Sequence, residues 1–210
     1  MPIPPDFVFS AIVTLFVVVD PLGLAPTYLA VTHGLPNDAR RSVATRAAII
    51  AAAILAGAAL VGQWLLLALA ISLPAFRIAG GLLLFSIASE MVLGVRSERQ
   101  SKAAEQAIEE HVRNVAAFPL AFPLMAGPGA ITATILLAGQ TAGRPLKLAA
   151  LIVVIIAVAA ACFASFMLAA RIGRFLGATG NVVLQRLLGV LLAALAVQYV
   201  IDGVRAVLAG

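Results

Sequence analysis

The stretch FVFSAIVTLFVVVDPLGLAPTYLAV, residues 7–31, decides the fold of this chain. Asp20 is its only charged residue, and two prolines and a glycine follow Asp20 within a few positions. About 20 apolar residues form a helix long enough to cross a bilayer, whereas proline inside a helix removes a backbone donor and clashes with the preceding turn. The stretch therefore predicts a membrane-spanning helix that is broken near its middle.

Similar apolar runs continue along the chain. Hydrophobic residues make up 63% of the 210 residues and charged residues 11%, against about 45–50% and about 25% in soluble domains. The runs do not alternate with period two, as a membrane barrel strand would, and the single cysteine, Cys162, excludes a disulfide scaffold. We predict an all-α polytopic membrane protein with six spans: Phe7–Val31, Ala47–Ile71, Ala75–Val95, Val115–Ala138, Leu146–Ala170 and Val182–Val204.

The basic residues fall unevenly on the two sides of these spans. One side receives ten, namely Arg40, Arg41, Arg46, Arg96, Arg99, Lys102, Arg113, Arg171, Arg174 and Arg186. The other receives four, namely Arg77, Arg144, Lys147 and Arg205. Positive residues favour the cytoplasmic side, which predicts that both termini are extracytoplasmic. The net charge of +5 then needs no nucleic-acid partner.

A polar stretch divides the chain into two halves that repeat each other. We predict a first three-helix repeat over residues 1–96, a partly helical cytoplasmic linker over 97–114, and a second three-helix repeat over 115–210, which together form one membrane domain. Two patterns of the first half recur at equal spacing in the second: the pair Pro21 and Pro26 matches Pro123 and Pro128, and Arg77, Gly80 and Gly94 match Arg186, Gly189 and Gly203. An odd number of spans inverts the second half, an arrangement that many secondary transporters share.

The matched breaks in the first and fourth spans are the candidate binding site. Non-helical backbone is tolerated in a membrane only where protein or a watery cavity satisfies it, so we expect both breaks to lie inside the bundle near the midplane. The free N–H groups of the half-helices that follow would attract an anion such as a carboxylate. The candidate substrate-binding residues are Asp20, Pro21, Gly23, Pro26, Thr27, Gly127, Pro128, Gly129 and Thr132. The alternative is a pair of packing kinks.

Two acidic residues lie within the predicted spans, and both are candidates for holding a coupling ion. Asp20 would bind a substrate ammonium, Na⁺ or a proton, or would simply hydrogen-bond to the freed backbone of its own break. Glu90 lies at a similar predicted depth. It would share a proton or flank a cation path with Asp20, or would reach the cytoplasmic edge beside Arg96.

Three segments resemble those of the MarC family: Asp20-Pro-Leu-Gly-Leu-Ala-Pro26, Ala79-Gly-Gly-Leu-Leu-Leu-Phe85 and Pro123-Leu-Met-Ala-Gly-Pro-Gly-Ala-Ile-Thr132. The resemblance covers essentially the whole chain. It implies a six-span protein of the bacterial or archaeal inner membrane, related to the LysE-type exporter superfamily, and a family in which some members are described as transporters of small neutral amino acids. The family usually has asparagine at the position of Asp20.

We therefore predict a secondary transporter of small solutes, with small neutral amino acids favoured, that works by alternating access with H⁺ or Na⁺ coupling. A channel or a structural membrane protein is the alternative. An intramembrane enzyme is disfavoured because both histidines, His33 and His111, fall in predicted loops. We expect no cofactor and no metal, and membrane lipid and a small molecule as partners. Homo-oligomerisation and the direction of transport stay open.

Overall fold

The computed structural model describes residues 4–109, 114–141 and 143–209, and helices are the only regular elements in these ranges. The predicted all-α class is thus confirmed. The helices, in chain order, are α1 (Pro5–Val19), α2 (Ala25–Val31), α3 (Asn37–Ala68), α4 (Leu73–Leu93), α5 (Val95–Glu109), η1 (Ala116–Met125), α6 (Pro128–Gly139), α7 (Pro145–Met167) and α8 (Ala169–Leu208). The predictions made for His111 and Arg113 lie outside the described residues.

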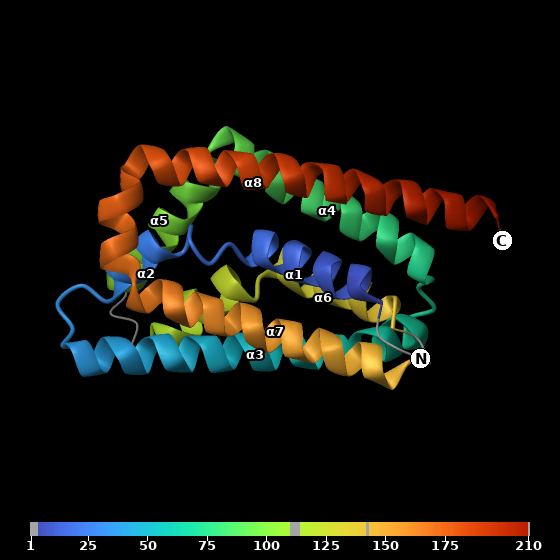
Figure 1. Ribbon diagram of the computed structural model, residues 1–210, viewed down its shortest axis with the longest axis horizontal. Coiled ribbons are helices and arrows are strands. Elements are labelled where there is room, and N and C mark those ends of the chain that lie inside the picture. The colour runs from blue at the N-terminus through green and yellow to red at the C-terminus, as the bar shows by residue number, and fades with distance from the viewer. Residues whose placement is uncertain (1–3, 110–113, 142, 210) are drawn as a thin grey trace.

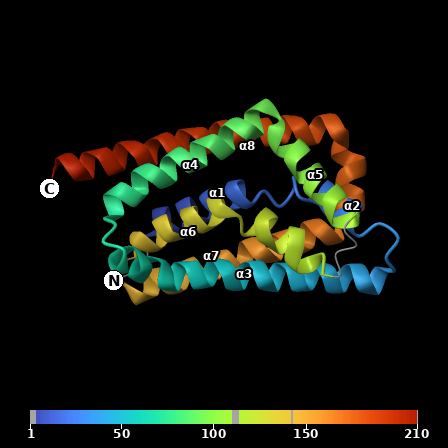
Figure 2. The same cartoon turned by 180° about the vertical axis from the view of Figure 1, so that it is seen from behind.

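The helices form a bundle of three layers (Figures 1 and 2). The layer of α1 and α6 lies between the layer of α3 and α7 and the layer of α4 and α8. The short helices α2 and α5 lie together at one end of the bundle, and α1 begins and α8 ends toward the other. Nearly every residue of α6 is buried, so the core of the bundle is centred on this helix.

Four of the described helices are long and apolar enough to cross a membrane: α3, α4, α7 and the part of α8 from Thr179 to Leu208. The pair η1 and α6 makes a fifth if the two are counted as one span, although they are bent by 56°. The first predicted span is not one helix, because α1 ends at Val19 and the seven-residue α2 begins at Ala25. The structure therefore establishes a multi-pass membrane protein, and the count of six stays a prediction.

Small residues set the close packing of α4 on α8. A Cβ added to Gly81 would lie 2.7 Å from the carbonyl oxygen of Ala196, and one added to Gly189 would lie 2.8 Å from the Cβ of Met91. A Cβ on Gly203 would lie 3.0 Å from the carbonyl oxygen of Pro74. Successive residues of α8 thus contact residues of α4 that come earlier and earlier in the chain. The two helices therefore run antiparallel, as Figure 1 also shows.

The predicted linker is more than a solvated connector. Its helical character is confirmed, because α5 begins directly after Gly94, whose backbone takes the left-handed conformation with φ 83°. However, Gln100 and Ala104 are buried, and α5 packs on α2, α4 and η1. The charged sequence hid this contact because two of the buried residues of α5, Arg96 and Gln100, are themselves polar.

Candidate functional site

The first break is built by the residues around Asp20. Proline at position 21 disfavours the helical conformation for the residue before it, and Asp20 takes the left-handed conformation instead, with φ 57° and ψ 64°. Aspartate and asparagine adopt this conformation more readily than other residues with a Cβ. The chain turns through residues 20–24 and then resumes as α2. The predicted interruption of the first span is therefore present.

The carboxyl of Asp20 is enclosed by this turn and by α8. Its Oδ1 accepts a hydrogen bond of 3.0 Å from the backbone N–H of Gly23, and its backbone carbonyl accepts one of 3.2 Å from Leu24. The carboxyl also lies beside the side-chain amide of Gln185 and interacts with it. Asp20 is only 1% exposed, so its side chain fills the inside of the turn.

The second break lies between η1 and α6. Phe118 and Phe122 both precede prolines and have extended backbone angles, with φ near −130°, as expected for residues before proline. The segment η1 is consequently a π-type helix with irregular turns. A new helix begins at Pro128, a favoured residue for the first helical position. A Cβ on Gly127 would lie 2.3 Å from the carbonyl oxygen of Pro123, so this turn requires glycine.

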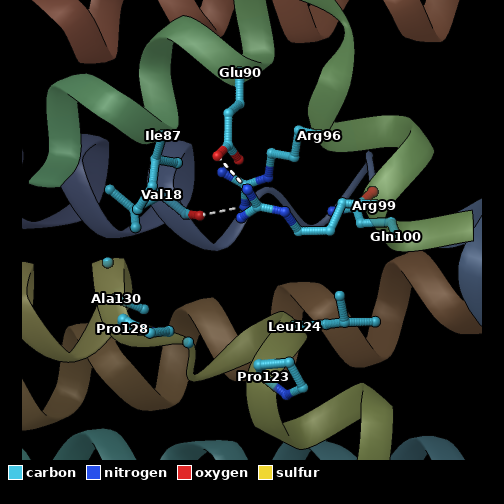
Figure 3. A pocket seen from close by; sticks show the side chains of 12 residues that line it. Val18, Ile87, Glu90, Arg96, Arg99, Gln100, Pro123, Leu124, Pro128 and Ala130 are labelled. Carbon is cyan, nitrogen blue, oxygen red and sulfur yellow. Dashed lines mark hydrogen bonds and ion pairs between the residues drawn. The ribbon is translucent and has the colours of Figure 1, made fainter. Parts of the chain in front are cut away.

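A cavity of 270 Å³ lies where the two breaks approach each other. Val18 borders it from the end of α1, and residues 127–130 border it from the second break. The two walls are close, since a Cβ on Gly129 would lie 3.5 Å from Cγ1 of Val18. Helices α4 and α5 complete the cavity with Ile87, Glu90, Arg96, Arg99 and Gln100, and η1 contributes Pro123 and Leu124 (Figure 3).

Three charged residues line this cavity. Glu90 forms an ion pair with Arg99, the side chain of which is 65% exposed. Arg96 is only 9% exposed, and its Nη2 donates a hydrogen bond of 2.7 Å to the carbonyl oxygen of Val18 (Figure 3). The charge of Arg96 also interacts with those of Asp20 and Glu90. The cavity wall is thus predominantly apolar with a basic cluster at one end.

The predicted site residues fall into two groups. Gly127, Pro128, Gly129 and Glu90 line the cavity. Asp20, Pro21, Gly23, Pro26, Thr27 and Thr132 belong to the breaks or the following helices but are not among the cavity's lining residues. Thr132 is buried, and its methyl group packs where Gly80 of α4 leaves room, whereas Pro26 is exposed.

Comparison with known proteins identifies the family. The family model described as MarC family integral membrane protein matches residues 6–208. The chain belongs to the MarC family.

Relatives of this MarC-family chain occur in archaea and bacteria. A UPF0056 membrane protein of Archaeoglobus fulgidus is 38% identical over 204 residues, covering 94% of this chain and 92% of the relative. The UPF0056 membrane protein YhcE of Escherichia coli is 33% identical over 205 residues, covering 96% of this chain and 94% of the relative. A UPF0056 membrane protein of Aquifex aeolicus is 34% identical over 198 residues. No solved structure matches the chain.

Sequence reasoning missed two polar residues at the candidate site. Arg96 was assigned to a cytoplasmic group of basic residues, but it is buried against the first break. The signal that could have found it is its position next to Gly94, which allows the chain to turn back toward the bundle. Gln185 is buried on α8 beside Asp20, and only the pairing of α8 with the first break reveals it.

Proposed function

We propose that this MarC-family protein is a secondary transporter of small solutes, with small neutral amino acids as the first candidates. The observation that carries the proposal is the cavity between the end of α1, just before the first break, and the residues of the second break. Transporters commonly bind substrate between discontinuous helices at the interface of two repeats. At 270 Å³ the cavity is below the range of about 300–1,000 Å³ typical of sites for drug-sized ligands, which favours a small cargo.

The pairing of helices supports an alternating-access mechanism. In chain order, α1, α3 and α4 of the first half lie against α6, α7 and α8 of the second. The colour gradient in Figure 1 runs in opposite directions along α3 and α7, and likewise along α4 and α8, so both of these pairs are antiparallel. Antiparallel pairing of corresponding elements is what two inverted repeats would produce. On this proposal α1 with α2 and η1 with α6 are broken spans, six spans result, and rocking of the repeats would open the cavity to either side.

The charge distribution supports the orientation that we propose. The elements carrying the larger basic group include the start of α3, helix α5 and the start of α8, and these lie at one end of the bundle. By the positive-inside rule that end would be cytoplasmic, and both termini would be extracytoplasmic in a bacterial or archaeal cell membrane.

We also propose that transport is coupled to H⁺ or Na⁺, with Asp20 and Glu90 as candidates for the coupling ion. The carboxyl of Asp20 is enclosed and shares its surroundings with the charge of Arg96. A second cation would be repelled there, so a proton fits this position better than Na⁺ does. No enzymatic step is part of the proposal.

The test is a flux measurement with the full-length protein in proteoliposomes. A panel of radiolabelled neutral, acidic and basic amino acids is assayed under imposed H⁺ or Na⁺ gradients, with protein-free liposomes as the control. A transporter gives saturable uptake that an imposed gradient drives above equilibrium, and Asp20→Asn alters the gradient dependence. Unsaturable flux that only equilibrates the solute would instead indicate a channel, and the absence of flux for every solute would contradict transport.

A further inference from the structure

The buried guanidinium of Arg96 is the most unusual charged group in the described part of the chain. A guanidinium has five N–H donors, yet its hydrogen bond at the break goes to a neutral acceptor, the carbonyl oxygen of Val18. The ion pair found among the described residues joins Glu90 to Arg99 and leaves Arg96 without a carboxylate in contact. A buried cation with no direct counter-ion is costly, so the site favours an anion that could reach it.

The wall opposite Arg96 also favours an anion. The first residues of the 12-residue helix α6, Pro128, Gly129 and Ala130, line the cavity. The first N–H groups of a helix have no intrahelical acceptor and carry partial positive charge. No side chain caps this end of α6. A buried arginine and an uncapped helix start therefore face the same 270 Å³ cavity.

The carboxylate of Glu90 does not cancel the positive charge of Arg96 and of the start of α6. The carboxylate of Glu90 is held by Arg99, and Asp20, although it interacts with Arg96, is engaged by the N–H of Gly23 and by Gln185. Two of the residues that line the cavity are arginines and one is a glutamate. The cavity therefore has room and charge for one small anionic group.

We propose that Arg96 is the specificity-determining residue of the cavity and binds the carboxylate of a small solute. The inference deepens the proposed transport function and rests on the same cavity. In the structure the Val18 carbonyl occupies one donor of Arg96, and both residues line the cavity. An entering carboxylate would replace that neutral acceptor with a bidentate, charge-assisted partner. Solutes that lack a carboxylate would gain no such replacement.

The experiment measures ligand binding directly, so that it does not depend on transport. Full-length protein in detergent is titrated with two matched pairs, L-alanine with L-alaninamide and propionate with propionamide, and thermal stabilisation gives an apparent Kd for each. The amide members keep the size of the acid but lack the carboxylate. We expect each acid to bind the wild type at least about tenfold more tightly than its amide, as charged hydrogen bonds exceed neutral ones.

Substitutions assign that preference to Arg96. In Arg96→Gln the acid-to-amide ratio should fall toward one, and in Arg96→Lys it should fall at least about threefold, since lysine lacks the planar fork. Lys102→Gln is the matched control, because Lys102 lies on the same helix, is exposed and does not line the cavity. If Arg96→Gln does not fold, as gel filtration would show, Arg96→Lys alone decides.

The outcomes separate this inference from the proposed function. A wild type that does not distinguish acids from amides, or an Arg96→Lys variant that keeps the wild-type ratio, would overturn the role of Arg96. Binding that prefers acids through Arg96, combined with no flux in proteoliposomes, would support the inference and contradict the transport proposal. Flux of amino acids, combined with an unchanged acid-to-amide ratio in the Arg96 variants, would support the transport proposal and contradict the role of Arg96.

Discussion

Gly23→Ala tests whether the first break is closed by the side chain of Asp20. A Cβ at position 23 would lie 2.0 Å from Oδ2 of Asp20, 2.6 Å from its Cγ and 2.4 Å from Nε2 of Gln185. Atoms do not approach so closely, so the carboxyl must move. The movement would lengthen the 3.0 Å hydrogen bond from the Gly23 N–H and disturb the contact with Gln185.

The magnitude follows from two effects that share one cause. Inserting a methyl group into a packed site costs about 1–3 kcal/mol, and weakening a hydrogen bond to a charged acceptor costs about 1.5–3 kcal/mol. Because a single displacement produces both, we expect the free energy of unfolding to fall by about 2–4 kcal/mol. For a chain of this size that loss corresponds to a decrease in Tm of about 5–15 °C.

The assay is thermal unfolding of purified protein in detergent, followed by circular dichroism and by light scattering. Gly57→Ala is the matched control, because Gly57 lies inside α3 and a Cβ there would meet no atom within 4 Å. Removing a mid-helix glycine at such a site should raise stability by about 0.5–1 kcal/mol. A Gly23→Ala protein that melts within about 1 °C of the wild type, less than the change expected from 1 kcal/mol, would refute the enclosed position of Asp20.

Three further predictions concern the rest of the molecule. Glu90→Gln or Arg99→Gln should lower the free energy of unfolding by less than about 1 kcal/mol, because the arginine of this ion pair is 65% exposed. A double-mutant cycle on Tm measures the coupling between the two side chains, and a larger coupling would mean that the pair is shielded from solvent. Gly81→Ala should cost about 1–3 kcal/mol, since its Cβ would lie 2.7 Å from the carbonyl oxygen of Ala196; an unchanged Tm would contradict the close packing of α4 on α8. Cys162 is the single cysteine and is fully buried, so a maleimide should label the protein only after unfolding, and rapid labelling of the folded protein would show that α7 is exposed at that position.

The sequence allowed the helical class and both breaks to be predicted, because each depends on local chemistry. Prolines at 21 and 123 act on their own neighbours, and the apolar runs are long enough to be read without knowing their partners. The same local reading located Gly127 and Pro128 at the second break, where the structure shows a turn and a helix start. These features need no knowledge of tertiary contacts.

The cavity was not predictable in the same way, because its walls come from segments distant in sequence. Arg96 lies in the part of the chain where charge indicates solvent, and only the turn at Gly94 brings it back to Val18. Likewise, Gln185 faces Asp20 because α8 of the second half crosses the break of the first. Counting residues gives only the depth of a residue along its helix axis. It does not show which faces of neighbouring helices are in contact.

Aspartate and asparagine are both compatible with the backbone conformation at position 20. Both residues adopt the left-handed conformation more readily than other residues with a Cβ, and both carry a side-chain oxygen that can accept a hydrogen bond from the N–H of Gly23. The backbone role of the position is therefore conserved when the amide becomes a carboxyl. What the carboxyl adds is a titratable group within electrostatic range of Arg96.

That titratable group connects the break to the proposed binding site. Arg96 contacts α1 through Val18 and interacts with Asp20, while it is carried by α5, the helix between the two proposed repeats. A ligand can shift a conformational equilibrium only if it interacts differently with the two states. A carboxylate bound by Arg96 would compete with the Val18 carbonyl and weaken the link between α1 and α5. Occupancy of the cavity would then favour a rearrangement around the first break, as coupled transport requires.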